Sequence, residues 1–154
     1  MNARIRETQE TVHEYRRGGF VISTDRARLD GNAVHAFLTD CYWAKGIPKE
    51  IVLRSIAGSL CFGVYKGDRL AGFARVISDF ATYAYIADVF VLDEYRGQGL
   101  GTWLMQCILE HPPLDGLRRW SLVTRDAHGL YRRFGFGEPD LERQMFRPRR
   151  VSDG

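Results

Sequence analysis

The chain has 154 residues, of which 45% are hydrophobic and 27% charged, which fits one globular domain with its own core. Its net charge of +3 is too small for the dense basic surface of a nucleic-acid binder, so we expect no nucleic-acid partner. No apolar run approaches the ~20 residues that span a membrane, and the polar start of the chain lacks the apolar stretch of a signal peptide. We therefore expect a cytoplasmic protein without a membrane partner.

The first half of the chain begins with a short predicted strand, "FVIST" (20–24). Asp30 is a suitable cap for a helix whose apolar residues follow helical spacing from residue 34 to 42. Pro48 then favours the first turn of a second helix that runs to about Ala57.

Three further strands are predicted in the middle of the chain: "LCFGVY" (60–65), "RLAGFARVI" (69–77) and "TYAYIADVFVL" (82–92). The intervening turn "KGD" joins the first two as a hairpin, which predicts an antiparallel meander. A helix follows from near Gly99, and Pro112 with its neighbouring proline ends it.

The last third continues with a strand at 118–123 and a helix that Asp126 caps and Gly135 closes. Residues 135–147 are expected to supply one or two closing strands. A meander followed by a β-α-β unit gives a mixed sheet. We expect a polar segment over residues 1–19, a single domain over 20–147 and a tail over 148–154.

Metal and disulfide chemistry are not expected. Cys41, Cys61 and Cys107 are widely spaced, with no CxxC pair, and no histidines stand at HExxH spacing. The sequence therefore predicts free thiols in a reducing compartment and no metal site.

The stretch "RGQGLG" (96–101) lies between a predicted strand and a predicted helix. Glycines at this point let an anion approach the unpaired N–H groups of a helix N-terminus. Thr102 stands where a dinucleotide-binding GxGxxG would need glycine, and a P-loop would need a lysine that this stretch lacks.

Two motifs resemble those of the GCN5-related N-acetyltransferase (GNAT) family. In the first, Arg96, Gly99 and Gly101 match the acyl-CoA pyrophosphate loop [Q/R]xxGx[G/A]. In the second, "TRDAHGLYRRFGF" is similar to NxxAxxLYxKxGF, with Thr124 where asparagine is usual. The residues in register are Ala127, Leu130, Tyr131, Arg133, Gly135 and Phe136.

The resemblance implies an α/β (α+β) GNAT fold, with a mixed, mostly antiparallel sheet of about six or seven strands and about four helices. It implies an N-acetyltransferase that moves an acetyl group from acetyl-CoA to an amine by direct attack on the thioester. Similar proteins bind the cofactor through the loop and the strand before it, where a main-chain N–H near Phe90 would meet the thioester oxygen. The implied acetyl-CoA residues are Val89, Phe90, Val91, Arg96, Gly97, Gln98, Gly99, Leu100, Gly101, Thr102, Tyr131 and Arg133.

Tyr131 and Asp88 are the candidate catalytic residues. Tyr131 stands where the family has a tyrosine that donates to the departing sulfur, although the helix pattern alone would make it a core aromatic. Strand alternation predicts that Ile86, Asp88 and Phe90 share one face, which would put a carboxylate beside the thioester as a general base. The alternative interpretation is that Asp88 caps loop amides or pairs with Arg75.

The resemblance implies that the first two helices and their connection form one wall of the acceptor site. Candidate contacts are aromatic residues for a cation or flat ring and charged residues for either sign of substrate: Tyr42, Trp43, Arg75, Asp79, Tyr83 and Asp88. The preferred acceptor is a small-molecule primary amine. A protein or peptide acetyltransferase and a non-catalytic acyl-CoA sensor are the alternatives, and homodimers are common among similar proteins.

Overall fold

The structure is a computed structural model that describes residues 11–149. The predicted polar segment over 1–19 and the tail over 148–154 therefore lie partly outside the described residues. Contacts divide the chain into two compact units, residues 1–124 and 125–154. The single domain over residues 20–147 stays a prediction.

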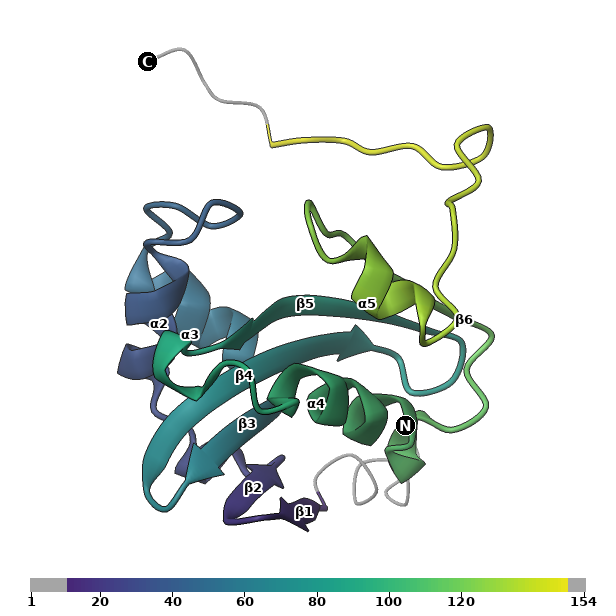
Figure 1. Ribbon diagram of the computed structural model, residues 1–154. Coiled ribbons are helices and arrows are strands. Elements are labelled where there is room, and N and C mark those ends of the chain that lie inside the picture. The colour runs from purple at the N-terminus through teal and green to yellow at the C-terminus, as the bar shows by residue number, and fades with distance from the viewer. Residues whose placement is uncertain (1–10, 150–154) are drawn as a thin grey trace, which may run out of the picture. The chain divides into compact units, whose positions relative to one another are not determined.

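The first unit is built on one six-stranded sheet with its strands in sequence order (Figure 1). Neighbouring strands are antiparallel from β1 to β5, whereas β5 and β6 are parallel. The strands are β1 (Glu14–Arg17), β2 (Phe20–Ser23), β3 (Leu60–Lys66), β4 (Arg69–Ser78), β5 (Tyr83–Val91) and β6 (Arg119–Leu122). The expected mixed, mostly antiparallel sheet is thus confirmed.

The described residues hold four α-helices and three short 3-10 helices. The α-helices are α2 (Gly31–Leu38), α3 (Lys49–Ala57), α4 (Leu100–Leu109) and, in the second unit, α5 (His128–Arg132). The 3-10 helices are η1 (Arg26–Arg28), η2 (Asp93–Tyr95) and η3 (Pro112–Leu114).

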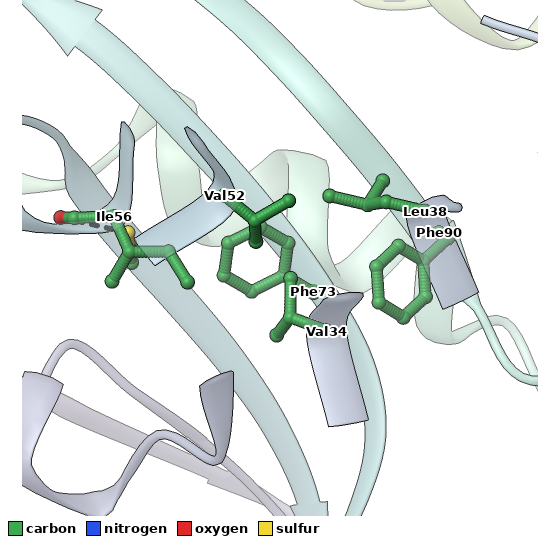
Figure 2. Packing of buried hydrophobic residues seen from close by; sticks show 7 residues of the cluster. Val34, Leu38, Val52, Ile56, Phe73 and Phe90 are labelled. Atoms are coloured by element: carbon green, nitrogen blue, oxygen red, sulfur yellow. Dashed lines mark hydrogen bonds between the residues drawn. The ribbon is translucent and has the colours of Figure 1, made fainter. Parts of the chain in front are cut away.

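Helices α2 and α3 pack side by side on one face of the sheet (Figure 1). The side chain of Asp30 accepts hydrogen bonds from the N–H groups of Asn32 and Ala33, so the predicted cap starts α2. Figure 2 shows Phe73 of β4 and Phe90 of β5 among aliphatic side chains of the two helices. Those helix residues are Val34, Leu38, Val52 and Ile56.

Helix α4 covers the opposite face, where it contacts β3 and β5. Leu104, Met105 and Ile108 are fully buried there. His111, just past the end of α4, meets the ring of Phe62 from β3 at 5.1 Å between ring centroids. A helix layer on each face makes the first unit a three-layer structure, and the glycine loop lies where β5 leads into α4.

Four elements differ from the sequence predictions. Strand β1 was not predicted, because its sequence "EYRR" has only one apolar residue, yet it pairs with β2 through the tight turn after Arg17. Helix α2 ends at Leu38, before the predicted stripe ends, and residues 39–46 form turns.

The other two differences lie in the second unit. Helix α5 has Ala127 as its N-cap with no side-chain cap hydrogen bond, so Asp126 does not cap it. Gly135 closes the helix as predicted, with a φ of 89°. The described residues from 135 to 149 form no strand, so the closing strands were a wrong prediction; Gly137 and Pro139 interrupt the run.

Candidate active site

The glycine loop turns the chain from η2 into α4. Gly97 and Gly99 have φ values of 80° and 75°, a conformation that side chains other than glycine's rarely adopt. Gly99 is the N-cap of α4, no side chain caps the helix, and its first turn has no acidic residue. The first N–H groups of α4 are therefore left for a ligand.

Gly101 has a different reason to be glycine. Its φ is not positive, and a Cβ placed on it would meet no atom within 4 Å. Neither backbone strain nor packing among the described residues requires glycine there. The absence of a side chain at Gly101 leaves the N-terminal end of α4 open, and we call this end the mouth of α4. This is the arrangement in which a phosphate group can approach main-chain amides closely.

Arg96 faces the loop from its N-terminal side. Its Nε donates to the carbonyl of Val91 at 3.2 Å, and its Nη1 pairs with Asp93 at 3.0 Å. Both side chains of that ion pair are mostly exposed, so the pair is weak and Arg96 can exchange Asp93 for a phosphate.

A β-bulge interrupts β5 just before the loop. Phe73 pairs with Phe90 and Arg75 with Ala87, so Ala74 alone opposes both Asp88 and Val89. Asp88 has a φ of 54° and is one of two non-glycine residues with positive φ among those described. Such a conformation is costly and clusters at functional sites.

The bulge corrects the predicted alternation of side chains. Ile86 pairs with Val76, whereas Asp88 forms an ion pair with Arg75, and neighbouring residues of β4 face opposite sides. Ile86 and Asp88 are therefore not on one face. The bulge turns Asp88 toward the side of the sheet that carries Phe90 and helices α2 and α3.

Asp88 is held at both carboxylate oxygens. Nε of Arg75 donates to Oδ2 at 2.9 Å, and Nε1 of Trp43 donates to Oδ1 at 3.1 Å. The Arg75 and Asp88 side chains are only 16% and 13% exposed. Arg75 also donates to Oγ of Ser59 at 3.2 Å. Of the two interpretations of Asp88, the geometry therefore favours pairing with Arg75.

Trp43, which donates to Asp88, belongs to a group of packed aromatic rings. Trp43 meets Tyr42 edge to face at 5.1 Å, and Phe37 of α2 stacks on Phe90 at 3.9 Å. Tyr42 and Trp43 lie in the turns after α2 and are about half exposed. The structure thus brings Tyr42, Trp43, Arg75 and Asp88 together beside the bulge.

Asp79 and Tyr83 lie elsewhere, in the β4–β5 connection and at the start of β5. Five residue steps, or roughly 15 Å of strand, separate Tyr83 from Asp88. Asp79 accepts hydrogen bonds from the hydroxyl and N–H of Thr82 and from the N–H groups of Ala81 and Tyr83, and these bonds hold its pKa well below the ordinary value. The hydroxyl of Tyr83 meets that of Ser121. The side chains of Asp79 and Tyr83 therefore make hydrogen bonds at the end of the sheet where β4 leads into β5.

The second unit carries the other predicted residues. Tyr131 of α5 is buried, and its ring meets Phe136 edge to face at 6.1 Å. Arg133, at the C-cap of α5, is exposed, and the neighbouring Arg132 pairs with Glu138. The roles of Tyr131 and Arg133 toward the cofactor stay predictions.

Sequence reasoning missed Arg17 as a candidate residue and left open whether Tyr85 faces the acceptor or packs in the core. Tyr85 lies in β5 on the face of Arg75, and burial followed by the charge of Asp88 raises its pKa. Arg17 of β1 donates to the carbonyl of Gln98 in the loop at 3.3 Å. The alternation of β5 carried a signal for Tyr85, but no local pattern marked Arg17, because β1 itself was not predicted.

The sequence matches the Acetyltransferase (GNAT) family over residues 12–136. A curated protein of Gibberella zeae, named as an acetyltransferase, is 32% identical over 138 residues, which cover 75% of this chain and 77% of that protein. The chain therefore belongs to the GNAT family of acetyltransferases.

Solved structures agree with this assignment. A crystal structure described as a GNAT-family acetyltransferase from Xanthomonas campestris pv. campestris is 48% identical, with a TM-score of 0.79 and coverage of 92% of this chain and 94% of that one. A Staphylococcus aureus structure at 24% identity has a TM-score of 0.68 over 85% of this chain and 99% of its own, and it shows the shared fold alone.

The described residues offer neither a metal-binding cluster nor a membrane-spanning helix. Between residues 11 and 149, no cluster of three or more His, Cys, Asp or Glu side chains is arranged to hold a metal ion. None of the helices described has the length and apolar character needed to cross a membrane.

Proposed function

We propose that this protein is an N-acetyltransferase that transfers the acetyl group of acetyl-CoA to the primary amine of a small molecule. The observation that carries the proposal is the open mouth of α4. No side chain caps its N-terminus, its first turn has no acidic residue, and a Cβ on Gly101 would meet no atom within 4 Å. Members of the GNAT family generally use acetyl-CoA, and its pyrophosphate is the kind of anion that such a helix end binds.

The chemistry follows from what the site offers. The amine nitrogen attacks the thioester carbonyl, the C–S bond breaks, and the coenzyme A thiolate leaves with the electron pair. The carbonyl oxygen becomes negative during the attack and needs a preorganised N–H donor. The bulge at Asp88 and Val89 breaks the regular ladder and supports a donor at Val89, Phe90 or Val91, whereas the N–H of Leu92 already donates to Ala71 at 2.8 Å.

The acceptor is proposed to bind over the ion pair of Arg75 and Asp88, beside Trp43. A protonated amine would be attracted by the Asp88 carboxylate and by the aromatic faces of Trp43 and Tyr42. Because both oxygens of Asp88 already accept hydrogen bonds, proton removal by this side chain must use a remaining lone pair or a water molecule. Tyr131 is proposed to donate to the departing sulfur.

The proposal is tested with purified protein in two steps. Calorimetry measures acetyl-CoA binding, and release of free thiol then reports turnover against a panel of polyamines, amino acids, aminoglycosides and peptides. We expect binding of acetyl-CoA and turnover of at least one small amine. Absence of any coenzyme A binding would contradict the whole proposal. Binding with turnover of peptides alone would instead identify a peptide, not a small molecule, as the acceptor.

A non-catalytic acyl-CoA sensor would bind acetyl-CoA and release no thiol with any amine. The buried Tyr131 in the family motif weighs against it, since a sensor has no need of a proton donor. A cytoplasmic location and a homodimer belong to the proposal as predictions from the sequence.

A further inference from the structure

Arg17 is placed beside the glycine loop by a tight hairpin at the edge of the sheet. Gly18 and Gly19, with φ values of 50° and 80°, form the two-residue turn that joins β1 to β2. The turn pairs Arg17 with Phe20, whose ring meets that of Tyr95, in η2 before the loop, at 6.1 Å. The hairpin thus fixes Arg17 next to the segment that leads into α4.

The guanidinium of Arg17 contacts the loop and the first turn of α4 together. Its Nη2 donates to the carbonyl of Gln98 at 3.3 Å and lies 3.2 Å from the position that a Cβ on Gly99 would occupy. Its Cζ lies 5.2 Å from the centre of the Trp103 ring, a cation-π contact. One N–H group is used for the loop, and a guanidinium has five such donors.

The contact with Gln98 fixes the direction of an amide. In a trans peptide the C=O and the following N–H point in opposite directions, and none of the described peptide bonds is cis. Holding the Gln98 carbonyl toward β1 therefore turns the N–H of Gly99 away from β1. Arg17 in this way orients the first amide of the row that opens α4.

The charge of Arg17 has no counterpart in the first unit as described. No carboxylate forms an ion pair with Arg17 among residues 11–149, whereas Arg16 pairs with Glu14 and Arg96 with Asp93. A helix N-terminus carries partial positive charge, which normally attracts acidic side chains and disfavours a cation. With no ion-pair partner among residues 11–149, the Arg17 guanidinium keeps its full charge available for an anion that binds at this helix end.

We propose that Arg17 is a coenzyme A-binding residue that orients the Gln98–Gly99 peptide and adds positive charge for the phosphates. The inference rests on the proposed function, because it assigns a further residue to the same site. A guanidinium suits phosphate oxygens through paired, charge-assisted hydrogen bonds.

The test compares Arg17→Ala, Arg17→Gln and Arg17→Lys with a matched control, Arg16→Ala. Arg16 is the neighbouring residue of β1, with a 74% exposed side chain that pairs only with Glu14 among the described residues. Calorimetry measures the Kd of coenzyme A at low and high NaCl, and steady-state kinetics give KM for acetyl-CoA and kcat. Thermal melting checks that each variant is folded.

For Arg17→Ala we expect Kd and KM to rise about tenfold or more, with kcat at saturation within about twofold of wild type. Arg17→Gln keeps a hydrogen-bond donor without the charge, and Arg17→Lys keeps the charge without the paired N–H donors of the guanidinium. Each variant should therefore retain part of the affinity. Because the lost contact is ionic, the Kd of Arg17→Ala and Arg17→Gln should depend less on salt than that of wild type. The control should match wild type.

The inference is overturned if all three Arg17 variants bind coenzyme A within about twofold of Arg16→Ala. It is also overturned if affinity falls equally at every salt concentration and Arg17→Lys rescues nothing, because Arg17 would then act only as a clamp between β1 and the loop. These outcomes differ from failure of the proposed function, in which the wild-type protein itself binds no coenzyme A.

Discussion

At the scale of single residues, Asp88 shows how packing decides a side chain's role. In the sequence it is an acid in a β-rich run, equally able to act as a base or to pair with a cation. The bulge gives it a φ of 54° and turns it to Arg75 and Trp43, which come from a different strand and from the turns after α2. The ion pair is mostly buried, so each partner depends on the other.

Removing one partner of this pair should therefore cost stability. We expect Arg75→Met to lower the free energy of unfolding by about 3 kcal/mol, because it leaves the Asp88 carboxylate buried with Trp43 alone. Asp88→Asn should cost less, since an amide oxygen still accepts from Trp43. Urea denaturation of both single variants and the double variant gives the coupling, and a value near zero would contradict a direct pair.

The same carboxylate has a kinetic test. If Asp88 also takes the amine proton, the Asp88→Asn variant should lose the acidic limb of the pH profile of kcat/KM. The measurement needs the amine that the acceptor panel identifies. A profile that keeps the wild-type shape at lower amplitude assigns Asp88 to orientation of Trp43 and the substrate.

Tyr131 offers a cleaner test of proton donation. Tyr131→Phe should lower kcat by about tenfold to a thousandfold with little change in KM for acetyl-CoA, because only the hydroxyl that is proposed to donate to the leaving sulfur is lost. Tyr65→Phe is the matched control. The buried hydroxyl of Tyr65 has no hydrogen-bond partner among the described residues, so its loss should leave turnover unchanged. Equal turnover in both variants would remove the role of Tyr131.

At the scale of elements, the loop between β5 and α4 contains glycines that are needed for two different reasons. Gly99 has a left-handed backbone, whereas Gly101 has an ordinary φ and open space where a Cβ would stand. A methyl group at Gly99 therefore strains the fold, and a methyl group at Gly101 fills only the place where a ligand would approach.

We expect Gly101→Ala to keep or raise stability, by up to about 1 kcal/mol, while weakening acetyl-CoA binding about tenfold or more. Gly99→Ala should lower stability by about 1 kcal/mol or more. Thermal melting and calorimetry on both variants separate the two effects. Unaltered binding by Gly101→Ala would show that the mouth of α4 is not the anion site.

At the scale of the whole first unit, strand β1 is joined to the end of α4 through a buried histidine. His111 is 1% exposed, and its Nδ1 meets the hydroxyl of Tyr15 from β1 at 2.7 Å. Burial, and then the nearby His13, lower the pKa of His111 to about 4. In the unfolded chain the histidine has a pKa of about 6.5, so acid favours unfolding.

This difference should make the protein acid-sensitive. Stability from the neutral His111 is fully present above about pH 6.5 and is lost as the pH falls toward about 4, which amounts to about 2 kcal/mol between about pH 7.5 and about pH 5. Urea denaturation at the two pH values measures the loss. His111→Gln should abolish that part of the pH dependence, whereas His128→Gln, at an exposed histidine, should retain it.

The sequence by itself determined the family, the central order of helices and strands, and the glycine loop. These depend on signals read within a few residues: the period of apolar side chains, caps such as Asp30, and the spacing of glycines. The same local reading failed for β1 and for the closing strands, whose pairing depends on partners outside the segment.

Only the tertiary structure decided the bulge at Asp88, its pairing with Arg75 and Trp43, and the approach of Arg17 to the loop. The physical reason is distance along the chain. Arg17 and Gln98 are 81 residues apart and Trp43 and Asp88 are 45 apart, so their contacts follow from sheet register and helix packing and leave no mark in local pattern.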